Sequence, residues 1–151
     1  MERIVFEDED PEKGFVMLPD MKWDGKTVNT MCLLAIVHRR DLNSMRDLDG
    51  SHLELLENIR DKCLKAVEEK FDVRRDKVRL FLHYQPTFYH LHVHVNHLNH
   101  TLTDMPERNF SLNQIIENLK LDSDYYKKVA VEYVVRKNEM LYDLFKDRFE
   151  Q

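Results

Sequence analysis

The sequence predicts a single α+β domain, with a mainly antiparallel sheet and flanking helices. Three observations support this prediction. The chain has 151 residues, the length of one ordinary domain, and it contains no internal repeat or interdomain linker. Strand-like and helix-like patterns are mixed, without the regular strand–helix alternation of a doubly wound parallel sheet. Only three glycines and four prolines are present, so most loops are held by other residues.

The N-terminal half predicts three strands and one long helix. Apolar segments at residues 3–7, 15–18 and 31–37 are typical of strands. Ser51-His52-Leu53-Glu54 has the form of a capping box, so we expect a helix of about five turns from there to near Phe71. The apolar residues of that helix recur at helical spacing, at Leu56, Ile59, Cys63 and Val67.

Residues 78–109 predict a pair of strands followed by a loop. Residues 78–83 and 90–98 are interpreted as strands, with the chain turning between them at residues 84–87. Residues 99–109 are polar and are expected to form a loop.

The last third of the chain predicts two helices around one more strand. Ser111 precedes a short helix whose apolar stripe is Leu112, Ile115, Ile116 and Leu119. Val129, Val131, Tyr133 and Val135 alternate with other residues, which predicts a strand over residues 126–136. Asn138 is expected to cap a final helix.

Composition narrows the function and the compartment. The net charge of −5 argues against a general nucleic-acid coat, which is usually basic, but not against a small anionic ligand in a local pocket. Cys32 and Cys63 lie in apolar surroundings without disulfide or metal spacing, which indicates buried thiols in a reducing compartment. No signal peptide and no membrane span is recognisable. We therefore expect a cytosolic protein, with the nucleus as the alternative.

The most informative segment is His90-Leu91-His92-Val93-His94-Val95. On a strand, period-two alternation places His90, His92 and His94 on one face and the three apolar residues on the other. Histidine is a nucleophile and a proton shuttle near neutral pH, so the row is interpreted first as a reaction site. A zinc site is the second interpretation, although such a row spreads the rings too far to hold one ion comfortably. A merely solvated face ranks last.

Neighbouring residues suit phosphoryl chemistry. A hairpin folded through Pro86 would return His83 beside His94, and Thr87 lies in the turn between them. Two or three imidazoles and a hydroxyl could then surround one phosphate. A neutral imidazole would attack phosphorus to form a phosphoramidate, which water later hydrolyses. Because such chemistry rests on positioning and charge stabilisation, no metal is required.

The histidine segment resembles the histidine-triad (HIT) motif, His-x-His-x-His with apolar spacers. The longer run from His83 to His94 is similar to the C-terminal catalytic domain of the scavenger mRNA decapping enzyme family. Further agreement lies in four blocks, Arg3-Ile4-Val5-Phe6-Glu7, residues 14–23, Ala35-Ile36-Val37-His38-Arg39-Arg40 and residues 42–48. The resemblance covers nearly all of residues 1–151 and implies one HIT-like domain.

The resemblance also implies roles for individual residues. His92 matches the nucleophile, His90 the first triad position, and His94 and His83 phosphate-binding histidines. Thr87 keeps the hydroxyl of a family serine, and Arg108 matches a basic residue that reaches the phosphates. The strip that contacts the methylated guanine of an mRNA cap is matched by Pro19, Asp20 and Lys22.

Charge supports the match of Asp20, because N7-methylguanine is cationic and its edge donates protons that a carboxylate accepts. Plain structural roles remain open beside these assignments. Asp20 would suit a turn after Pro19, and Lys22 a solvated strand end. Trp23 is more often a core anchor than a base-stacking residue, and His38-Arg39-Arg40 equally suits a solvated strand end.

The expected activity is cleavage of the triphosphate bridge of an m7G cap dinucleotide or short capped RNA, without cofactor or metal. The product would be m7GMP plus a nucleoside diphosphate. A general HIT nucleotide hydrolase and a non-catalytic nucleotide-binding or dimerisation module are the alternatives. The resemblance implies a homodimer. It also implies that the family's N-terminal domain is absent from this chain, and that Phe88 replaces a family tyrosine.

Overall fold

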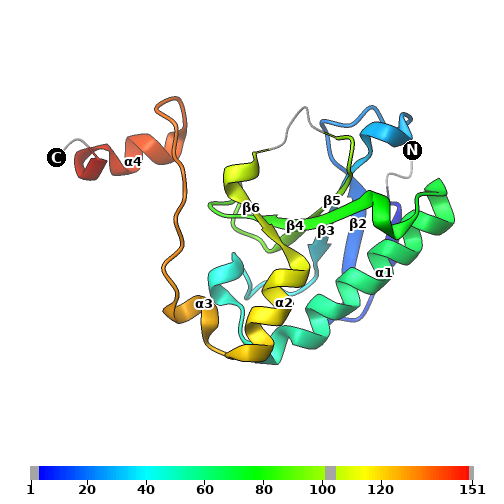
Figure 1. Cartoon of the computed structure of the whole chain (residues 1–151), viewed down its shortest axis with the longest axis horizontal. Helices are drawn as coiled ribbons and strands as arrows, with labels where there is room; N and C mark the ends of the chain where they lie inside the picture. The colour runs from blue at the N-terminus through cyan, green and yellow to red at the C-terminus, as the bar shows by residue number, and fades with distance from the viewer. Residues whose placement is uncertain (1–3, 101–104, 150–151) are drawn as a thin grey trace.

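The computed structural model describes residues 4–100 and 105–149, and it has one antiparallel sheet with helices packed beside it (Figure 1). The sheet order is β1-β2-β3-β5-β4-β6. The strands are β1 Phe6–Asp8, β2 Phe15–Pro19, β3 Cys32–Val37, β4 Val78–His83, β5 His92–His97 and β6 Asn109–Ser111. The helices are α1 Leu53–Phe71, α2 Leu112–Leu121, α3 Tyr125–Lys128 and α4 Met140–Phe149. The predicted α+β class is confirmed.

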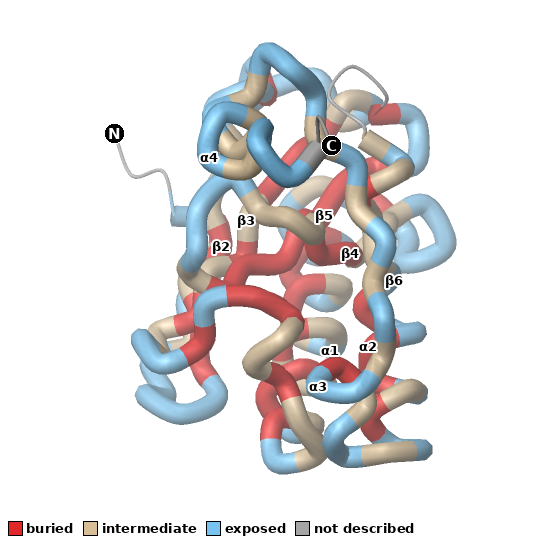
Figure 2. Tube along the Cα trace, turned by 90° about the vertical axis from the view of Figure 1, so that its left-hand side faces the viewer, coloured by how far each residue is buried: buried red, intermediate tan, exposed pale blue. Residues whose placement is uncertain are grey.

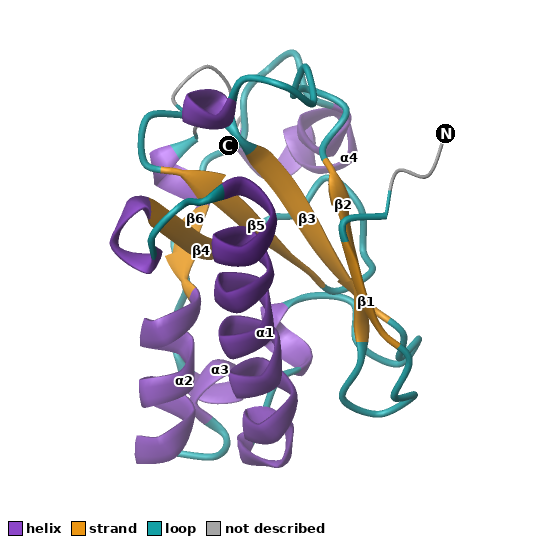
Figure 3. Cartoon of the chain, turned by 90° about the vertical axis from the view of Figure 1, so that its right-hand side faces the viewer, coloured by secondary structure: helices purple, strands orange, loops and turns teal. Residues whose placement is uncertain are grey.

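One face of the sheet carries the hydrophobic core. Val93 and Val95 of β5 are fully buried and share one cluster with Ile59 of α1 and Ile115 of α2. Both helices lie on this side of the sheet (Figure 3). Because side chains alternate along a strand, burying these two valines turns His92 and His94 to the opposite face.

Most of the predicted strands are confirmed. The 78–83 strand is found with those bounds, and the strands predicted at 15–18 and 31–37 each shift by one residue at one end. The 90–98 strand is shorter, since β5 begins at His92. β1 is found at Phe6–Asp8, and Arg3 lies outside the described residues. The 99–109 loop also contains a 3₁₀ turn, Pro106–Arg108, and the first residue of β6, and residues 101–104 lie outside the described ranges.

The start of α1 differs from the prediction. A 3₁₀ turn, Gly50–His52, precedes the helix, and its cap is Asp49, whose side chain accepts a hydrogen bond from Ser51 N at 2.9 Å. The Ser51 hydroxyl donates to the same carboxylate. The capping box predicted on Ser51 is therefore wrong, because Ser51 lies inside this turn, and the residue at the cap of α1 is His52, whose side chain makes no cap hydrogen bond. The helix predicted after Ser111 is confirmed, and the structure adds that Ser111 caps it, with Gln114 N donating to Ser111 Oγ.

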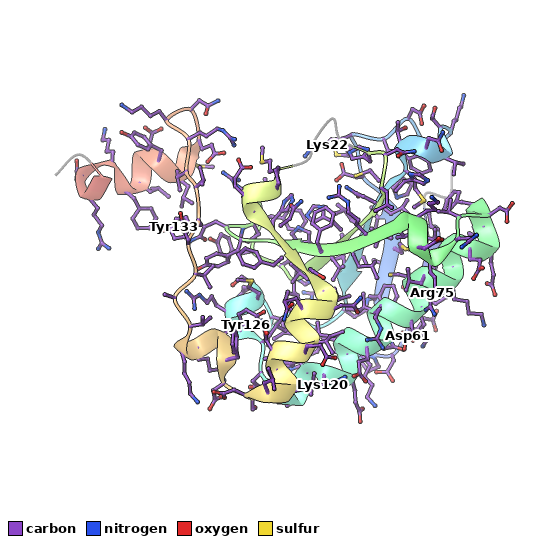
Figure 4. All side chains as sticks on the ribbon, in the orientation of Figure 1. Lys22, Asp61, Arg75, Lys120, Tyr126 and Tyr133 are labelled. Atoms are coloured by element: carbon purple, nitrogen blue, oxygen red, sulfur yellow. The ribbon has the colours of Figure 1, made fainter. Side chains whose placement is uncertain are left out.

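The strand predicted over residues 126–136 is wrong. Tyr126 belongs to α3, and residues 131–136 form no described strand. They run instead as an extended arm on the outside of the molecule toward α4 (Figures 1 and 4). The half-buried Tyr133 of the arm packs edge-on against Tyr84, with ring centroids 5.8 Å apart. An arm packed through alternate side chains has the same period as a paired strand, so the pattern alone could not separate them.

The final helix is found, but it begins at Met140, so Asn138 lies two residues before it rather than directly at its start. Most of α4 is exposed (Figure 2). No helix within the described ranges is long and apolar enough to cross a membrane.

The core that supports the sheet predicts a large cost for truncating Ile59. Because Ile59 is fully buried between α1 and the sheet, Ile59→Ala should lower the free energy of unfolding by about 2–5 kcal/mol. Lys65→Ala, an exposed change on the same helix, should alter it by less than about 0.5 kcal/mol. Urea unfolding of the two variants measures both effects. Equal midpoints would contradict the placement of α1 on the core.

Candidate active site

Two histidines of β5, rather than three, project from the face of the sheet opposite the hydrophobic core. His92 lies opposite Ile36 of β3, and His94 lies opposite Leu34 on β3 and Phe81 on β4. His90 precedes the strand, so the expectation of a three-ring row on one strand is wrong. The ring of His90 turns to the end of β3, where its Nε2–H donates to the Val37 carbonyl at 2.7 Å.

The tautomer of His92 is fixed by its backbone. Nδ1 lies 2.7 Å from the carbonyl oxygen of His90. A carbonyl only accepts, so Nδ1 carries the proton and Nε2 keeps its lone pair. Burial, the largest cause, lowers the pKa of His92 below 6.5, which keeps the ring neutral at pH 7. The side chain therefore has the state of a nitrogen nucleophile.

His83 and His94 form a close pair beside His92. The β4–β5 pairing brings their ring centroids within 4.0 Å, and the ring of His94 lies 5.2 Å from that of His92. The predicted return of His83 to His94 is thus confirmed. Burial, the largest cause in both, lowers the pKa of His83 to about 4 and that of His94 to about 2. Repulsion from the charges of His92 and Lys22 adds to the lowering of both pKa values.

One nitrogen of this pair lacks a protein partner. His94 Nε2 is buried and makes no hydrogen bond among the described residues. A buried polar atom left without a partner costs free energy, and at such a position a ligand can supply the missing bond. An anion placed here would also raise the pKa values that burial has lowered. The geometry suits a phosphate.

The loop between β4 and β5 covers His92. The ring of Phe88 stacks on His92, with centroids 4.0 Å apart and planes 15° from parallel. Thr87, expected to bind phosphate, is exposed in the same loop next to Phe88. The sequence did not predict this stacking. Phe88 lies in a loop and His92 on a strand, and no periodic pattern in a sequence indicates how a loop is placed over a strand.

Arg108 is held by Val134 of the arm and by Glu139, which follows the arm. Its Nη2 donates to both carboxylate oxygens of Glu139 at 2.5 Å and to the Val134 carbonyl at 3.3 Å. Its Nε is buried without a hydrogen-bond partner among the described residues. The charge of Arg108 contributes to the lowered pKa of His83, after burial and the charges of His92 and Lys22. Arg108 therefore lies near the histidines, but its guanidinium is already paired with the carboxylate of Glu139. The contact with Glu139, 31 residues away, left no signal in the sequence.

Pro19, Asp20 and Lys22 lie where β2 ends. The Asp20 N–H donates to the Cys32 carbonyl, and its Oδ1 accepts from Lys22 N at 2.9 Å, so the turn role of Asp20 is confirmed. The same carboxylate favours the protonated form of His92, and Lys22 disfavours that of His94. The strip is therefore within electrostatic reach of the histidines. Lys22 itself is exposed at the edge of the fold (Figure 4).

Other candidates from the sequence have structural roles. Trp23 is buried against Phe71, with ring centroids 5.7 Å apart, and its Nε1 donates to the Thr27 carbonyl. The Nε2–H of His38 donates to the Asp8 carbonyl, and Arg39 is paired with Asp41. Among the residues that the structure describes, no group of three or more His, Cys, Asp and Glu side chains is placed to hold a metal ion.

Known proteins resemble this chain in sequence. Residues 1–108 match the family model described as "Scavenger mRNA decapping enzyme C-term binding". An m7GpppX diphosphatase of Caenorhabditis elegans is 42% identical over 151 residues, covering 97% of this chain and 48% of the relative. That of Homo sapiens is 38% identical over 147 residues, covering 97% and 44%. The chain thus spans about half the length of the curated relatives it matches.

The fold is also found among solved structures. The aprataxin ortholog Hnt3, crystallised in complex with DNA, superposes with a TM-score of 0.53 over 99% of this chain and 88% of the other. The sequence identity is 13%, so the likeness shows the HIT-like fold alone.

The buried histidine pair predicts a pH dependence of stability. The pKa of His94 is about 2 in the folded chain against 6.5 ordinarily, so below pH 6.5 the unfolded chain binds more protons. The free energy of unfolding should therefore fall as pH drops from about 7 to 4, with His94 contributing up to about 1.4 kcal/mol per pH unit. Urea unfolding across this range should show a shallower fall for His94→Gln. Parallel curves would contradict the burial of a neutral His94.

Proposed function

The chain belongs to the scavenger mRNA decapping enzyme C-terminal family, and from that premise we propose that it hydrolyses the triphosphate bridge of m7G-capped dinucleotides or short capped RNAs. The products would be m7GMP and a nucleoside diphosphate. The observation that carries the proposal is the state of His92, whose Nδ1–H is bonded to the His90 carbonyl so that Nε2 keeps a lone pair. The name of the relatives, m7GpppX diphosphatase, supplies the substrate class.

The first step forms a bond between Nε2 of His92 and the phosphorus that carries 7-methylguanosine. The bond from that phosphorus to the bridging oxygen breaks, and the nucleoside diphosphate leaves with the electron pair. Nδ1 keeps its proton throughout, so positive charge develops on the ring and faces the oxygen of His90. The carbonyl dipole stabilises that charge.

The neighbouring histidines bind the non-bridging oxygens. His94 Nε2, buried without a protein partner, is suited to donate a hydrogen bond to one of them. Bound polyphosphate raises the pKa values of His83 and His94, which gives these rings charge only when substrate is present. Arg108 would add its charge once a phosphate competes with Glu139 for the guanidinium. Thr87 would bring its hydroxyl to the phosphates from the exposed loop.

The second step restores the enzyme. Water attacks the phosphorus, the N–P bond breaks, and its electron pair returns to Nε2 of His92. A proton of the water is released with the m7GMP product. The reaction consumes one water for each bridge that is cut.

The cap base would lie against Pro19, Asp20 and Lys22. Asp20 is half-buried at the end of β2, and its carboxylate is close enough to influence the pKa of His92. A carboxylate accepts from the protonated edge of N7-methylguanine and balances its positive charge. This arrangement would place the methylated end of the cap beside the nucleophile.

We also propose a homodimer in the cytosol or nucleus. Met140 and Leu144, one turn apart on α4, are 80% and 73% exposed, an apolar surface that a second copy can cover. The free thiols of Cys32 and Cys63 are both buried, which fits a reducing compartment.

The covalent step gives the most direct test of function. Cap dinucleotide labelled at the phosphate next to 7-methylguanosine should leave an acid-labile label on His92. His92→Asn should lose the label and at least about 10³-fold of kcat. His97→Asn, a matched change of a buried histidine on the opposite face of β5, should keep both. Label on another residue, or on the His92→Asn variant, would contradict the mechanism.

Cap selectivity tests the base strip separately. Asp20→Asn removes the charge but keeps an oxygen that can accept from Lys22 N, so the turn should survive. We expect kcat/KM for methylated cap dinucleotide to fall about ten- to a hundredfold, with little change for the unmethylated one. Glu69→Gln, an exposed change on α1, serves as the control. Equal turnover of both dinucleotides by the parent protein would instead assign a general HIT nucleotide hydrolase.

A further inference from the structure

Phe88 has an unusual placement for a large apolar side chain. It is 42% exposed in the loop between β4 and β5, yet one face of its ring covers the imidazole of His92. The centroids lie 4.0 Å apart and the planes differ by 15°, whereas His92 itself is only 6% exposed. An exposed phenyl ring held flat on a buried imidazole points to a role at that imidazole.

The stacking and the backbone hydrogen bond constrain His92 in different ways. The phenyl ring fixes the plane of the imidazole, and the bond from Nδ1–H to the His90 carbonyl fixes its rotation within that plane. Together they leave Nε2 one direction in which to point. Orientation of a reacting atom of this kind contributes directly to rate.

The chemistry adds an electrostatic reason for the stacking. Because Nδ1 of His92 keeps its proton, the ring becomes positively charged as Nε2 bonds to phosphorus. The face of a phenyl ring is negative and attracts a cation placed over it. Phe88 carries no hydroxyl and no charge, so its ring face is all that it offers to His92.

We propose, on the basis of the proposed function, that Phe88 is a positioning residue whose ring face aligns His92 and stabilises the positive charge that its imidazole gains during attack on phosphorus. The attraction is stronger in the transition state than in the free enzyme, where the imidazole is neutral. It therefore raises kcat more than it lowers KM.

Other groups also act on the charge of His92. They are His90 before the strand, His94 on β5, His83 on β4 and Asp20 after β2. A test of Phe88 must leave these groups and the burial of the site unchanged. Replacing Phe88 with phenylalanines that carry one, two or three ring fluorines does so, because fluorine weakens the negative face with little change of shape.

The first measurement requires no turnover. NMR titration of His92 in the unliganded protein should give a pKa that falls stepwise as fluorines are added at Phe88, because the protonated ring loses its π partner while burial stays constant. The same substitutions at Phe110, a half-buried ring of β6, should leave the titration of His92 unchanged. A His92 pKa that does not respond to fluorination at Phe88 would overturn the proposal.

The second measurement is the single-turnover rate of label transfer to His92 from cap dinucleotide. The rate should fall along the fluorinated series, and Phe88→Leu, which keeps apolar bulk without a ring, should be about two- to thirtyfold slower at unchanged KM. Phe88→Tyr should stay close to the parent. A rate that is independent of fluorination would overturn the proposal. If no nucleotide substrate is turned over, the proposed function fails, and the titration series still decides the role of Phe88.

Discussion

The hydrogen bond from Nδ1–H of His92 to the carbonyl of His90 is the interaction on which the chemistry of this site depends. It determines which nitrogen holds the proton, and so which nitrogen would attack phosphorus in the proposed mechanism. The acceptor is itself held in place, because the ring of His90 donates to the Val37 carbonyl at the end of β3. The position of one lone pair is therefore set by the pairing of β3 with β5 and by the two valines that turn the histidines away from the core.

The site is built at a cost to stability. Burial lowers the pKa of three neighbouring imidazoles. It also leaves His94 Nε2 and Arg108 Nε without a hydrogen-bond partner in the part of the chain that the structure describes. Such groups weaken a folded protein, and the hydrophobic core on the other face of the sheet offsets them. In the proposed mechanism this arrangement would suit phosphoryl transfer, because an incoming polyanion would give charge to rings that burial keeps neutral.

The sequence was a good guide wherever periodicity carried the information. Strand 78–83, the apolar stripe of the helix after Ser111 and the return of His83 to His94 all follow from periodicity and a local turn. Prediction from the sequence failed where two different structures give the same sequence pattern. The 126–136 segment alternates because alternate side chains of the arm pack on the rest of the domain. The pattern at Ser51 resembles a helix cap, but the side chain that caps the turn there is Asp49, two residues earlier. Contacts between distant segments, such as that of Arg108 with Glu139, have no local signature.

The protonation of His92 can be observed directly. Nitrogen-15 NMR of histidine-labelled protein at neutral pH distinguishes a protonated ring nitrogen from one that keeps its lone pair. A protonated Nδ1 and an unprotonated Nε2 in His92 are the predicted result. A proton on Nε2 in the resting protein, with Nδ1 bare, would contradict the account, since the bond to His90 could then not exist and the nucleophile would be blocked.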